Sequence, residues 1–440
     1  MKKHLPFDFS RQFSLPPAVY PTKLFLRSWT FFSCRLFSVL LLFLLPLSIM
    51  AQPAYVFHEK GKKLFDQGKY LESIVQFDLA IKADATYFEG YLDRGRANEK
   101  LGKNDLAMAD YTKTTQLNAK YAPGFFYKAK LNAQLGNDQP AITDYTTAIK
   151  LNPDYLDSYV NRGMLYVKTK QSENALADFN KAVSLDGKNA EVLYQRGILF
   201  RDMKKQTEAL ADFTKAVSIN ANMGKAYFEQ GKIHAAQNKN DIAITEYAKA
   251  ITAGFATEEL YRAKGASNMA LGKNDEAIKD YSVVIDQFKS KDADMFRMRG
   301  ELYAKQKNYP LAIKDFNKAL TLKKDDIPTL LARADANVAQ GKTKYLPAET
   351  DYKKVLTLDA NNIRAARALG KLYFEQEKWQ LAADNLSIAI KAGGSAEDYD
   401  MRGRANFKLN NKKGACEDFN KAEQMGFPDA AKDKMSAGCK

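Results

Sequence analysis

Few residues of this 440-residue chain combine the type and the spacing that catalytic chemistry requires. His58 and His234 stand far apart, and neither has a cysteine at the spacing of a zinc site. Gly341-Lys342-Thr343 resembles the end of a phosphate-binding loop, but the upstream glycine of that motif is missing. The Gly-x-Ser-x-Gly turn of hydrolases is also absent. The sequence therefore predicts a protein that is not an enzyme, with no metal, no cofactor and no small-molecule substrate.

Basic and acidic residues nevertheless recur in pairs that lie 16 to 18 residues apart. The pairs are Arg94 with Asp110, Lys128 with Asp144, Arg162 with Asp178, Arg196 with Asp212, Lys264 with Asp280, Arg299 with Asp315, Arg333 with Asp351, and Arg402 with Asp418. Such regular recurrence favours structural ion pairs that join neighbouring elements over a row of ligand-binding groups. We expect these pairs to be partly buried, so that breaking one costs more than breaking a surface pair.

The elements that position these charges repeat with a period of 34 residues. Small residues mark the period at Gly61, Gly95, Ala129, Gly163, Gly197, Gly231 and Gly265, and continue with shifts of one or two residues at Gly300, Ala334, Gly370 and Gly403. A fixed period of this length predicts a helical-repeat array. Arrays of this kind are solenoids in which each unit contacts only its neighbours.

Each unit predicts two helices, as in 157–168 and 172–185, which are separated by a polar turn. In the second helix Ala175, Phe179 and Ala182 fall on one face, and the same pattern of a small residue, a ring and a small residue recurs along the chain. Glycine inside a helix costs about 1 kcal/mol relative to alanine, so the recurrent glycine needs a reason. We expect that it lets the paired helix approach and that the ring fills the space beside it.

These recurrent positions resemble the tetratricopeptide repeat family over about residues 54–429, in eleven units. The resemblance implies an all-α, right-handed superhelical solenoid of helix-turn-helix units whose first helices line a concave binding face. Two departures from the pattern, a two-residue insertion near residues 344–347 and Leu386 in place of the ring, predict local irregularity.

A ligand site on such a face is read from the residues that differ between units. These residues form an apolar and aromatic stripe with cations beside it, and the candidates are Lys62, Arg96, Lys130, Phe126, Tyr194, Phe228 and Lys232. The stripe is suited to a protein or peptide ligand of acidic character. The alternative is that these side chains pack against neighbouring units or lie in water. The asparagine and lysine arrangement by which some family members clamp a terminal carboxylate is not present.

Cys416 and Cys439 are the two cysteines that follow residue 51. Cys416 stands where other units carry isoleucine or leucine, so it suits a buried apolar thiol. An even number of cysteines in an exported protein also permits a disulfide, which would tie the C-terminal helix to the last unit. The sequence leaves both interpretations open.

The N-terminal segment indicates export. Residues 36–49 form an apolar run of 14 residues after a basic leader, and Ala51 closes the run. This pattern is typical of a signal peptide cleaved after Ala51, and the run is short for a membrane span of about 20 residues. An uncleaved anchor is the alternative, and only in that case would the protein contact a membrane.

Charge adds little further information. The net charge is +15, of which the first 51 residues carry +5, and no long basic run marks nucleic-acid binding. We therefore expect three parts: a signal peptide at 1–51, a repeat array at 54–429, and a capping helix with a tail at 430–440. The predicted function is a non-catalytic scaffold for protein–protein interactions in the cell envelope, located in the periplasm, at the cell surface or in the medium. The alternative is a membrane-anchored structural subunit of a secretion or surface machine.

Overall fold

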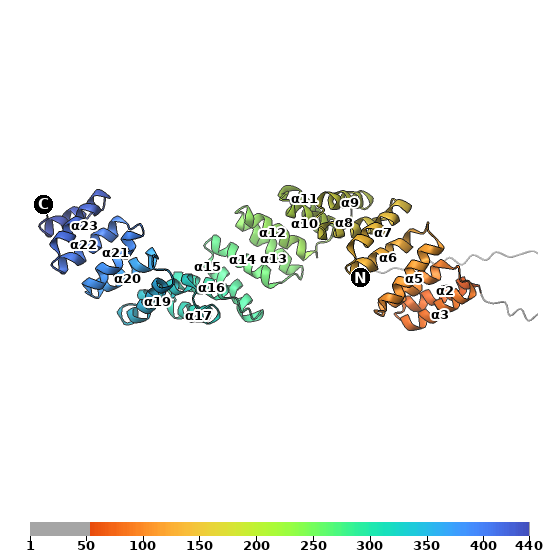
Figure 1. Ribbon diagram of the computed structural model, residues 1–440, viewed down its shortest axis with the longest axis horizontal. Coiled ribbons are helices and arrows are strands. Elements are labelled where there is room, and N and C mark those ends of the chain that lie inside the picture. Colours follow the sequence, from red (N-terminus) through yellow and green to blue (C-terminus); the bar gives the residue numbers. More distant parts are fainter. Residues whose placement is uncertain (1–52, 440) are drawn as a thin grey trace, which may run out of the picture. The chain divides into compact units, whose positions relative to one another are not determined.

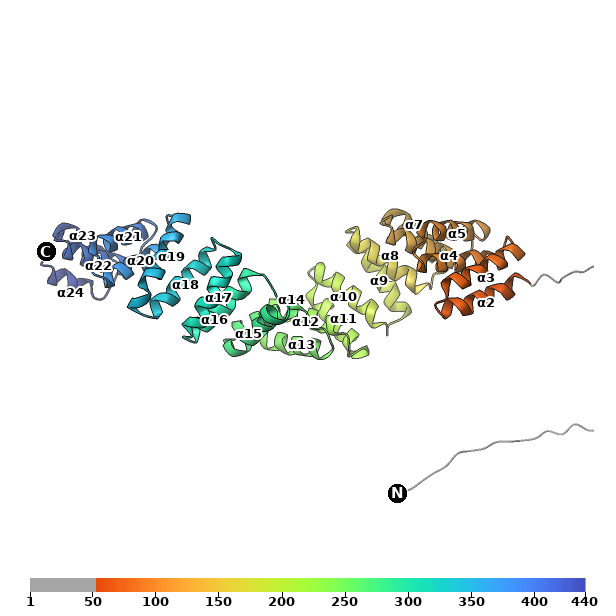
Figure 2. The ribbon, with the colours of Figure 1, turned by 90° about the horizontal axis from the view of Figure 1, so that it is seen from below.

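The computed structural model describes residues 53–439, and all regular structure within that range is helical (Figures 1 and 2). These residues fall into two compact units, which meet in the sequence between Lys103 and Asn104. The predicted signal at 1–51 lies outside the described residues. Within 53–439, none of the helices has the length and apolarity needed to cross a bilayer.

The first compact unit contains three helices. They are α2 (Ala54–Asp66), α3 (Tyr70–Ala83) and α4 (Phe88–Lys100). In each helix-turn-helix repeat we call the first helix helix A and the second helix B, so α2 and α3 are an A–B pair and α4 is the next helix A.

The second compact unit starts with a helix B and continues as A–B pairs in series. Its helices are α5 (Asn104–Leu117), α6 (Ala122–Gln134), α7 (Asp138–Leu151), α8 (Leu156–Lys168), α9 (Ser172–Leu185), α10 (Ala190–Asp202), α11 (Gln206–Ile219), α12 (Gly224–Ala236), α13 (Asn240–Thr252), α14 (Glu258–Ala270), α15 (Asn274–Ser282), α16 (Ala293–Lys305), α17 (Tyr309–Leu322), α18 (Ile327–Ala339), α19 (Tyr345–Leu358), α20 (Ile363–Glu375), α21 (Trp379–Lys391), α22 (Ala396–Lys408), α23 (Lys412–Gln424) and α24 (Ala430–Ser436). A π-helix, η1 (Val283–Gln287), follows α15, and a 3-10 helix, η2 (Lys342–Lys344), precedes α19.

The small residue of helix A lies against the ring of helix B, as the sequence predicts. A Cβ atom placed on Gly231 would lie 2.4 Å from Cε1 of Tyr247, and one on Gly197 would lie 2.6 Å from Cε1 of Phe213. The same contact recurs at Gly61 with Phe77, Gly163 with Phe179, Gly265 with Tyr281, Gly300 with Phe316, and Gly403 with Phe419. The glycines are therefore needed because the ring occupies the space of a side chain.

The helix-B face that meets this ladder is buried throughout the described residues. All eleven small residues that precede the ring have no exposed surface: Ser73, Ala107, Ala141, Ala175, Ala209, Ala243, Ala277, Ala312, Ala348, Ala382 and Ala415. The rings themselves are at most 2% exposed, from Phe77 to Phe419. The core is thus one repeated contact rather than a central cluster, which is expected for an array of stacked units.

The turns between helices A and B share one backbone geometry. Gly68 and Gly102 adopt positive φ angles of 76° and 72°, which glycine reaches without a Cβ penalty. In several other units Lys170, Lys204 and Asn238 take the equivalent place with φ between 58° and 60°. The turn therefore persists where the glycine is missing, because the packing of the two helices determines it.

Irregularities occur where the small-residue ladder shifts. The step from Gly265 to Gly300 is one residue longer than the period, and η1 lies between them, where a π-helix accommodates an inserted residue. The insertion near residues 344–347 adjoins η2, which lengthens the turn of its unit. The irregularity expected at Leu386 is not present, because α21 is a regular helix and Leu386 fills the place of the ring. Its Cγ would lie 2.8 Å from a Cβ placed on Gly370.

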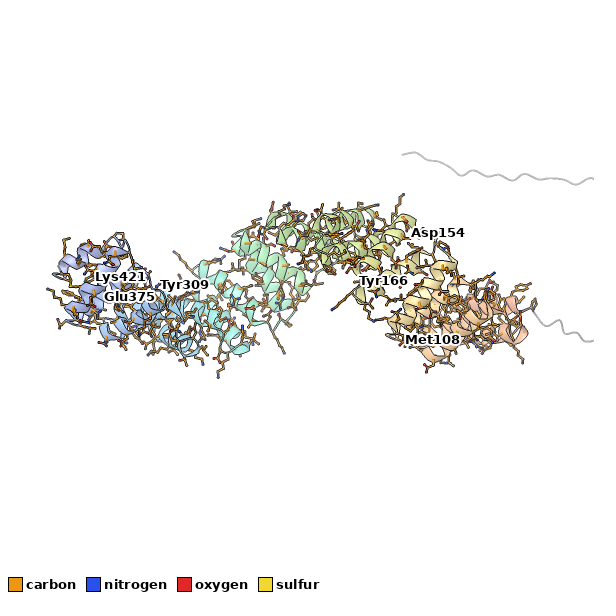
Figure 3. All side chains as sticks on the ribbon, turned by 45° about the horizontal axis from the view of Figure 1, so that its top comes forward. Met108, Asp154, Tyr166, Tyr309, Glu375 and Lys421 are labelled. Carbon is orange, nitrogen blue, oxygen red and sulfur yellow. A yellow bond between two sulfur atoms is a disulfide. The ribbon has the colours of Figure 1, made fainter. Side chains whose placement is uncertain are left out.

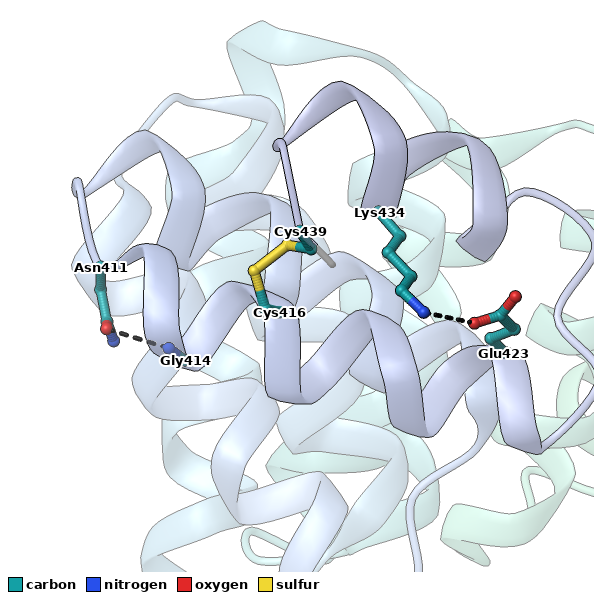
Figure 4. The surroundings of a disulfide bond; sticks show 6 residues. All are labelled: Asn411, Gly414, Cys416, Glu423, Lys434 and Cys439. Atoms are coloured by element: carbon teal, nitrogen blue, oxygen red, sulfur yellow. Dashed lines mark hydrogen bonds and ion pairs between the residues drawn. A yellow bond between two sulfur atoms is a disulfide. The ribbon is translucent and has the colours of Figure 1, made fainter.

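The C-terminal helix packs on the last repeat. Cys416 of α23 and Cys439, just after α24, form a disulfide that closes a separation of 23 residues (Figure 4). Ala437 packs with Ala415 and Phe419, and Lys434 Nζ lies 3.2 Å from Glu423 Oε2. The disulfide and these contacts hold α24 against α23.

Gly231→Ala is expected to destabilise the α12–α13 pair. The added methyl group overlaps the ring of Tyr247, and the overpacking outweighs the better helix propensity of alanine, for a net loss of about 1–2 kcal/mol. Chemical denaturation combined with hydrogen exchange at α12 and α13 measures the loss.

Gly187→Ala is the matched control for that substitution. Gly187 lies in a turn without a positive φ, and a Cβ there meets its nearest atom at 3.4 Å, an ordinary contact. Its stability should not fall and should rise by up to about 1 kcal/mol, because alanine reduces the conformational entropy of the unfolded chain. Equal losses in the two variants would contradict the close-packing explanation.

Cys439→Ser is expected to loosen α24 without unfolding the array. Loss of the closed loop removes about 3 kcal/mol from the free energy of opening at the C-terminus. Hydrogen exchange should accelerate at α24 and stay unchanged at α10 and α11. Mass analysis of the native parent that finds two free thiols would remove the basis of this prediction.

Candidate peptide-binding face

The recurrent arginine of helix A forms a two-pronged contact with the aspartate of its own helix B. Arg162 Nε lies 2.8 Å from Asp178 Oδ2, and its Nη2 lies 2.7 Å from Asp178 Oδ1. The same geometry joins Arg196 to Asp212, Arg299 to Asp315, Arg333 to Asp351 and Arg402 to Asp418. Bidentate pairs of this kind are the strong form of the ion pair.

The remaining nitrogen of each of these arginines binds the preceding unit. Nη1 of Arg162 donates to Thr146 Oγ1 of α7 at 2.8 Å, and Nη1 of Arg196 donates to Asn180 Oδ1 of α9 at 2.9 Å. Ser282 and Asn317 accept in the same way, so the acceptor is the residue that follows the ring. In the tenth unit the acceptor is Ser387, which follows Leu386 in the place of the ring. One arginine therefore joins three helices from two units, a link that the sequence analysis missed although this polar position recurs in the sequence.

Burial and the paired aspartate shift the pKa of Arg162 in opposite directions. Burial alone would lower the pKa of Arg162, but the hydrogen bonds and the charge of Asp178 raise the pKa above its ordinary value. Only 5% of the Asp178 side chain is exposed. The hydrogen bonds of Arg162 and Asp178 lie within the array, so this pair has a structural role.

In two units the aspartate faces a lysine instead of an arginine, and an asparagine then supplies the missing hydrogen bond. Lys264 Nζ binds only Oδ1 of Asp280, at 2.7 Å, and Asn268 Nδ2 donates to Oδ2 at 2.8 Å. Lys128 and Asn132 bind Asp144 in the same way. Where arginine is present, this place is aromatic in three units (Tyr166, Phe200 and Tyr303) and asparagine in the other three (Asn98, Asn337 and Asn406). The ring centre of Tyr166 lies 5.6 Å from Cζ of Arg162, whereas Asn406 Nδ2 donates to Asp418 Oδ2 at 3.0 Å. These asparagines are therefore packing residues.

The pair predicted between Arg94 and Asp110 joins residues of the two compact units and remains a prediction. Within the first unit, Arg94 Nη1 lies 2.7 Å from Asp78 Oδ1, the residue that follows the ring Phe77. The link to the preceding helix B is thus the same as in the second unit.

Two aromatic residues predicted to bind a ligand are core residues, which corrects the sequence analysis. Phe126 is 8% exposed and packs against Tyr145 and Tyr155, and Phe228 is 3% exposed and packs against Tyr247 and Phe255. The alternative interpretation, packing against neighbouring units, therefore holds for both rings. Whether a ring at this place is covered depends on the side chains that the next unit supplies.

Tyr194 is half-buried rather than free. Its ring lies 5.8 Å from that of Phe213, and Lys225 Nζ of the next helix A lies 4.3 Å from its ring centre. Lys225 also pairs with Glu191 at 2.8 Å. Tyr194 thus keeps part of its ring accessible beside a cation.

The predicted cations also have partners within the chain. Lys62 pairs with Glu59 at 2.9 Å, and Arg96 pairs with Asp93 at 2.7 Å in the first compact unit. In the second unit Lys130 lies 6.0 Å from the ring centre of Tyr127, and Lys232 pairs with Glu229 and Glu259 at 3.4 and 3.3 Å. The cations are therefore partly neutralised, which weakens the case for a strongly acidic ligand at these residues.

We define the helix-A face of the second compact unit as the exposed side of its successive A helices, which contact one another. Ion pairs cross this face between some of these helices: Arg201 with Glu229, Lys232 with Glu259, Arg262 with Asp292 just before α16, Arg364 with Asp335, Arg367 with Asp398, and Lys371 with Glu397. The residue types differ from unit to unit, unlike those of the buried ladder. Figure 3 shows the side chains and labels Tyr309 of α17 and Glu375 of α20.

A hollow of about 520 Å³ opens between α16, α17 and α18, with Arg364 of α20 at its rim. Its lining includes the alanines Ala304, Ala332, Ala336 and Ala339 and the rings of Tyr309 and Phe316. The ligand-binding residues predicted from the sequence lie further towards the N-terminus, and this site is not among them. The signal was present in the alanine-rich sequence of α18, IPTLLARADANVA.

Helix α24 covers the C-terminal end of this face. Arg404 of α22 lies between Asp400 of the same helix, at 2.8 Å, and Asp433 of α24, at 2.5 Å. Burial and the neighbouring Asp433 together raise the pKa of Asp400 to about 6, although the nearby Arg404 lowers it. Two carboxylates thus share one guanidinium at the junction of α22 and α24.

His58 is a buried structural residue of the first compact unit. In the first unit His58 is 6% exposed, with Nε2 2.8 Å from Asp93 Oδ2 and Nδ1 2.9 Å from Tyr87 Oη. Within residues 53–439 no three His, Cys, Asp or Glu side chains gather as they would around a metal ion.

Comparisons with known proteins agree with this geometry. The tetratricopeptide repeat family matches residues 125–155, 156–189, 190–223 and 262–327. No curated protein matches the chain. A solved structure of YrrB, described as a tetratricopeptide protein with an unusual peptide-binding site, is 20% identical, with 43% of this chain and 97% of that one covered and a TM-score of 0.39.

Two further solved structures are similar. PilF of Pseudomonas aeruginosa is 16% identical, with 46% of this chain and 92% of that one covered and a TM-score of 0.42. A tetratricopeptide repeat protein of Parabacteroides merdae is 17% identical, with 64% of this chain and 98% of that one covered and a TM-score of 0.32. At these identities the likeness concerns the fold.

The paired helices and the ladder of small residues and rings define the class as a helical-repeat array. With the family matches, the chain is a tetratricopeptide repeat protein. Proteins of this family bind protein or peptide partners and are typically non-catalytic.

Arg162→Lys is expected to cost about 1–2 kcal/mol, because lysine leaves one oxygen of Asp178 without its donor. Adding Tyr166→Asn should recover part of that loss, since asparagine supplies the donor in the lysine-containing units. A double-mutant cycle should give a favourable coupling of about 0.5–1.5 kcal/mol. The control cycle pairs Tyr166→Asn with the remote Arg333→Lys and should be additive. Equal couplings in both cycles would contradict the inference that asparagine replaces the hydrogen-bond donor lost when arginine becomes lysine.

Docking of α24 is expected to weaken as the pH rises through about 6. The folded pKa of Asp400 lies above the unfolded value of 3.8, so folding favours the protonated carboxyl. This stabilisation is full below the unfolded value and is lost as the pH rises through the folded one. Hydrogen exchange at α24 should therefore be slower at pH 5 than at pH 7.5, after correction for intrinsic exchange rates. In Asp400→Asn that corrected difference should shrink, and an unchanged difference would assign the effect to another group.

Proposed function

We propose that this tetratricopeptide repeat protein is an exported scaffold that holds a protein or peptide partner on its helix-A face. The observation that carries the proposal is the contrast between the two sides of the fold. The ladder side is repetitive and buried, whereas the helix-A face differs from unit to unit and contains an open hollow. A surface that varies while its support is constant is suited to selective recognition.

Two features support export to the cell envelope. The N-terminal sequence has the pattern of a signal peptide, and the described chain contains a disulfide, which persists in oxidising compartments. The membrane-anchored alternative differs only in whether residues 36–49 are retained. N-terminal sequencing of the native protein distinguishes the two, because a start near Gln52 supports the free scaffold and an uncleaved N-terminus supports the anchored subunit.

A photo-crosslinking amino acid tests the binding face directly. Placed at Arg364 or Lys371 on α20, it should capture the same partner in native cells, because both side chains reach solvent on the helix-A face. The matched controls are Lys318 of α17 and Lys354 of α19, which reach solvent on B helices and should capture little of that partner. Capture from the B helices alone, or from neither face, would overturn the proposed binding face.

A further inference from the structure

The hollow beside α18 exists because small side chains replace larger ones. Two residues after the small residue of helix A, six units carry a buried aliphatic side chain: Leu131, Leu165, Leu199, Ile233, Leu302 and Leu372. Ala336 takes this place in α18, as Ala97 and Ala405 do in α4 and α22. In α18, however, two further alanines, Ala332 and Ala339, stand one helical turn to either side. Ala304 of α16 faces the same space. A missing leucine with no bulky neighbour to fill its place leaves an open, methyl-lined hollow.

Its size and lining are those of a binding site rather than a packing fault. Small-molecule and peptide pockets range over roughly 300–1,000 Å³ and are mostly apolar, and this hollow measures about 520 Å³. Phe316 is fully buried at its wall and Tyr309 is partly exposed at its mouth. The surface is therefore rigid, apolar and open to solvent.

The charges at the rim are paired, with one exception. Glu301 accepts from Arg297 Nη1 at 2.7 Å, and Asp335 is bound by Arg364 and by Tyr352 Oη, the latter at 2.5 Å. Lys305 is exposed and forms no ion pair or hydrogen bond with the side chains described in 53–439. The rim thus carries one uncompensated positive charge beside an apolar hollow.

We propose that this hollow binds an apolar side chain of an extended peptide segment that carries a carboxylate next to that side chain. The alanine methyls and the ring of Tyr309 contact the apolar group, with the buried ring of Phe316 behind them, and Lys305 attracts the carboxylate. The occupant is a partner protein or peptide, so the proposal rests on the proposed function and specifies its ligand chemistry.

The test is an NMR titration of the full chain labelled at its alanine methyl groups. The probe is the tetrapeptide acetyl-Gly-Leu-Asp-Gly-amide, with the Asn analogue as the charge control and the Ala-Asp analogue as the apolar control. Saturable shifts are expected at Ala304, Ala332, Ala336 and Ala339 up to millimolar peptide. The Asn analogue should bind more weakly, and the Ala-Asp analogue should bind weakest. Shifts that are absent, or that are equal for all three peptides, would overturn the proposal.

Ala336→Leu separates binding from folding. Leucine restores the side chain that six other units carry, so the variant should be at least as stable as the parent, whereas its affinity for the probe should fall at least tenfold. If the variant is destabilised, Lys305→Gln supplies an independent result. A stable Ala336→Leu variant that binds the probe as tightly as the parent would contradict the assignment.

Lys305→Gln should weaken binding of the Asp peptide about two- to fivefold and leave the Asn analogue unchanged, since the contact is solvent-exposed. Lys408→Gln is the matched control, because Lys408 is exposed at the equivalent position of α22. An equal effect of both substitutions would assign the preference to overall charge rather than to the hollow.

The failure of this proposal differs from the failure of the proposed function. Crosslinks from Arg364 or Lys371 without methyl shifts at the hollow would retain the scaffold function and reject the hollow as its site. Methyl shifts at the hollow without a cellular crosslink would retain the hollow and reject the proposed partner face.

Discussion

The close contact between a small residue of helix A and a ring of helix B is the constraint on which the rest of the array depends. At Gly231 and Gly197 a Cβ would overlap the ring of the paired helix. This contact sets the spacing of each pair, and the spacing in turn decides which side chains of the next unit can reach the interface. Even the turn persists where Lys204 or Asn238 replaces glycine, at a positive φ that non-glycine residues rarely adopt. Helix packing therefore dominates local backbone preference in this protein.

The charged pairs extend that contact from one unit to the next. Arginine is suited to the role because its planar fork reaches both oxygens of one carboxylate and still offers a third nitrogen to the preceding helix B. Lysine cannot do this, and Asn268 supplies the donor that Lys264 lacks. Recurrent charges are thus part of the framework. Their internal pairing also explains how a chain rich in charged residues can bury a regular series of them without leaving them uncompensated.

The helix-A face follows a different rule, because no repeated contact restricts its residues. Ion pairs such as Arg367 with Asp398 join successive A helices, yet the partners change from unit to unit. The sequence pattern predicts Phe126 and Phe228 as ligand contacts, but rings of the adjoining segments cover both. The alanines of α18 and Ala304 instead line a hollow, where six other units place leucine or isoleucine at the position of Ala336. A candidate site on this face therefore depends on what each neighbour supplies. On this face the large side chains of Phe126 and Phe228 are covered by their neighbours, and the open hollow is lined by small side chains.

By itself the sequence determined the repeat, its helices, the buried ladder and the recurrent charge pairs. It could do so because a buried face that recurs in eleven B helices leaves the same residue types at the same spacing. Only the tertiary structure decided that Phe126 is core, that Arg162 also binds Thr146 of the preceding unit, that Cys416 is bridged to Cys439, and that a hollow adjoins Lys305. Each of these depends on a single neighbour in space. A feature that occurs once has no period, so its exposure and its partners are set by packing rather than by spacing along the chain.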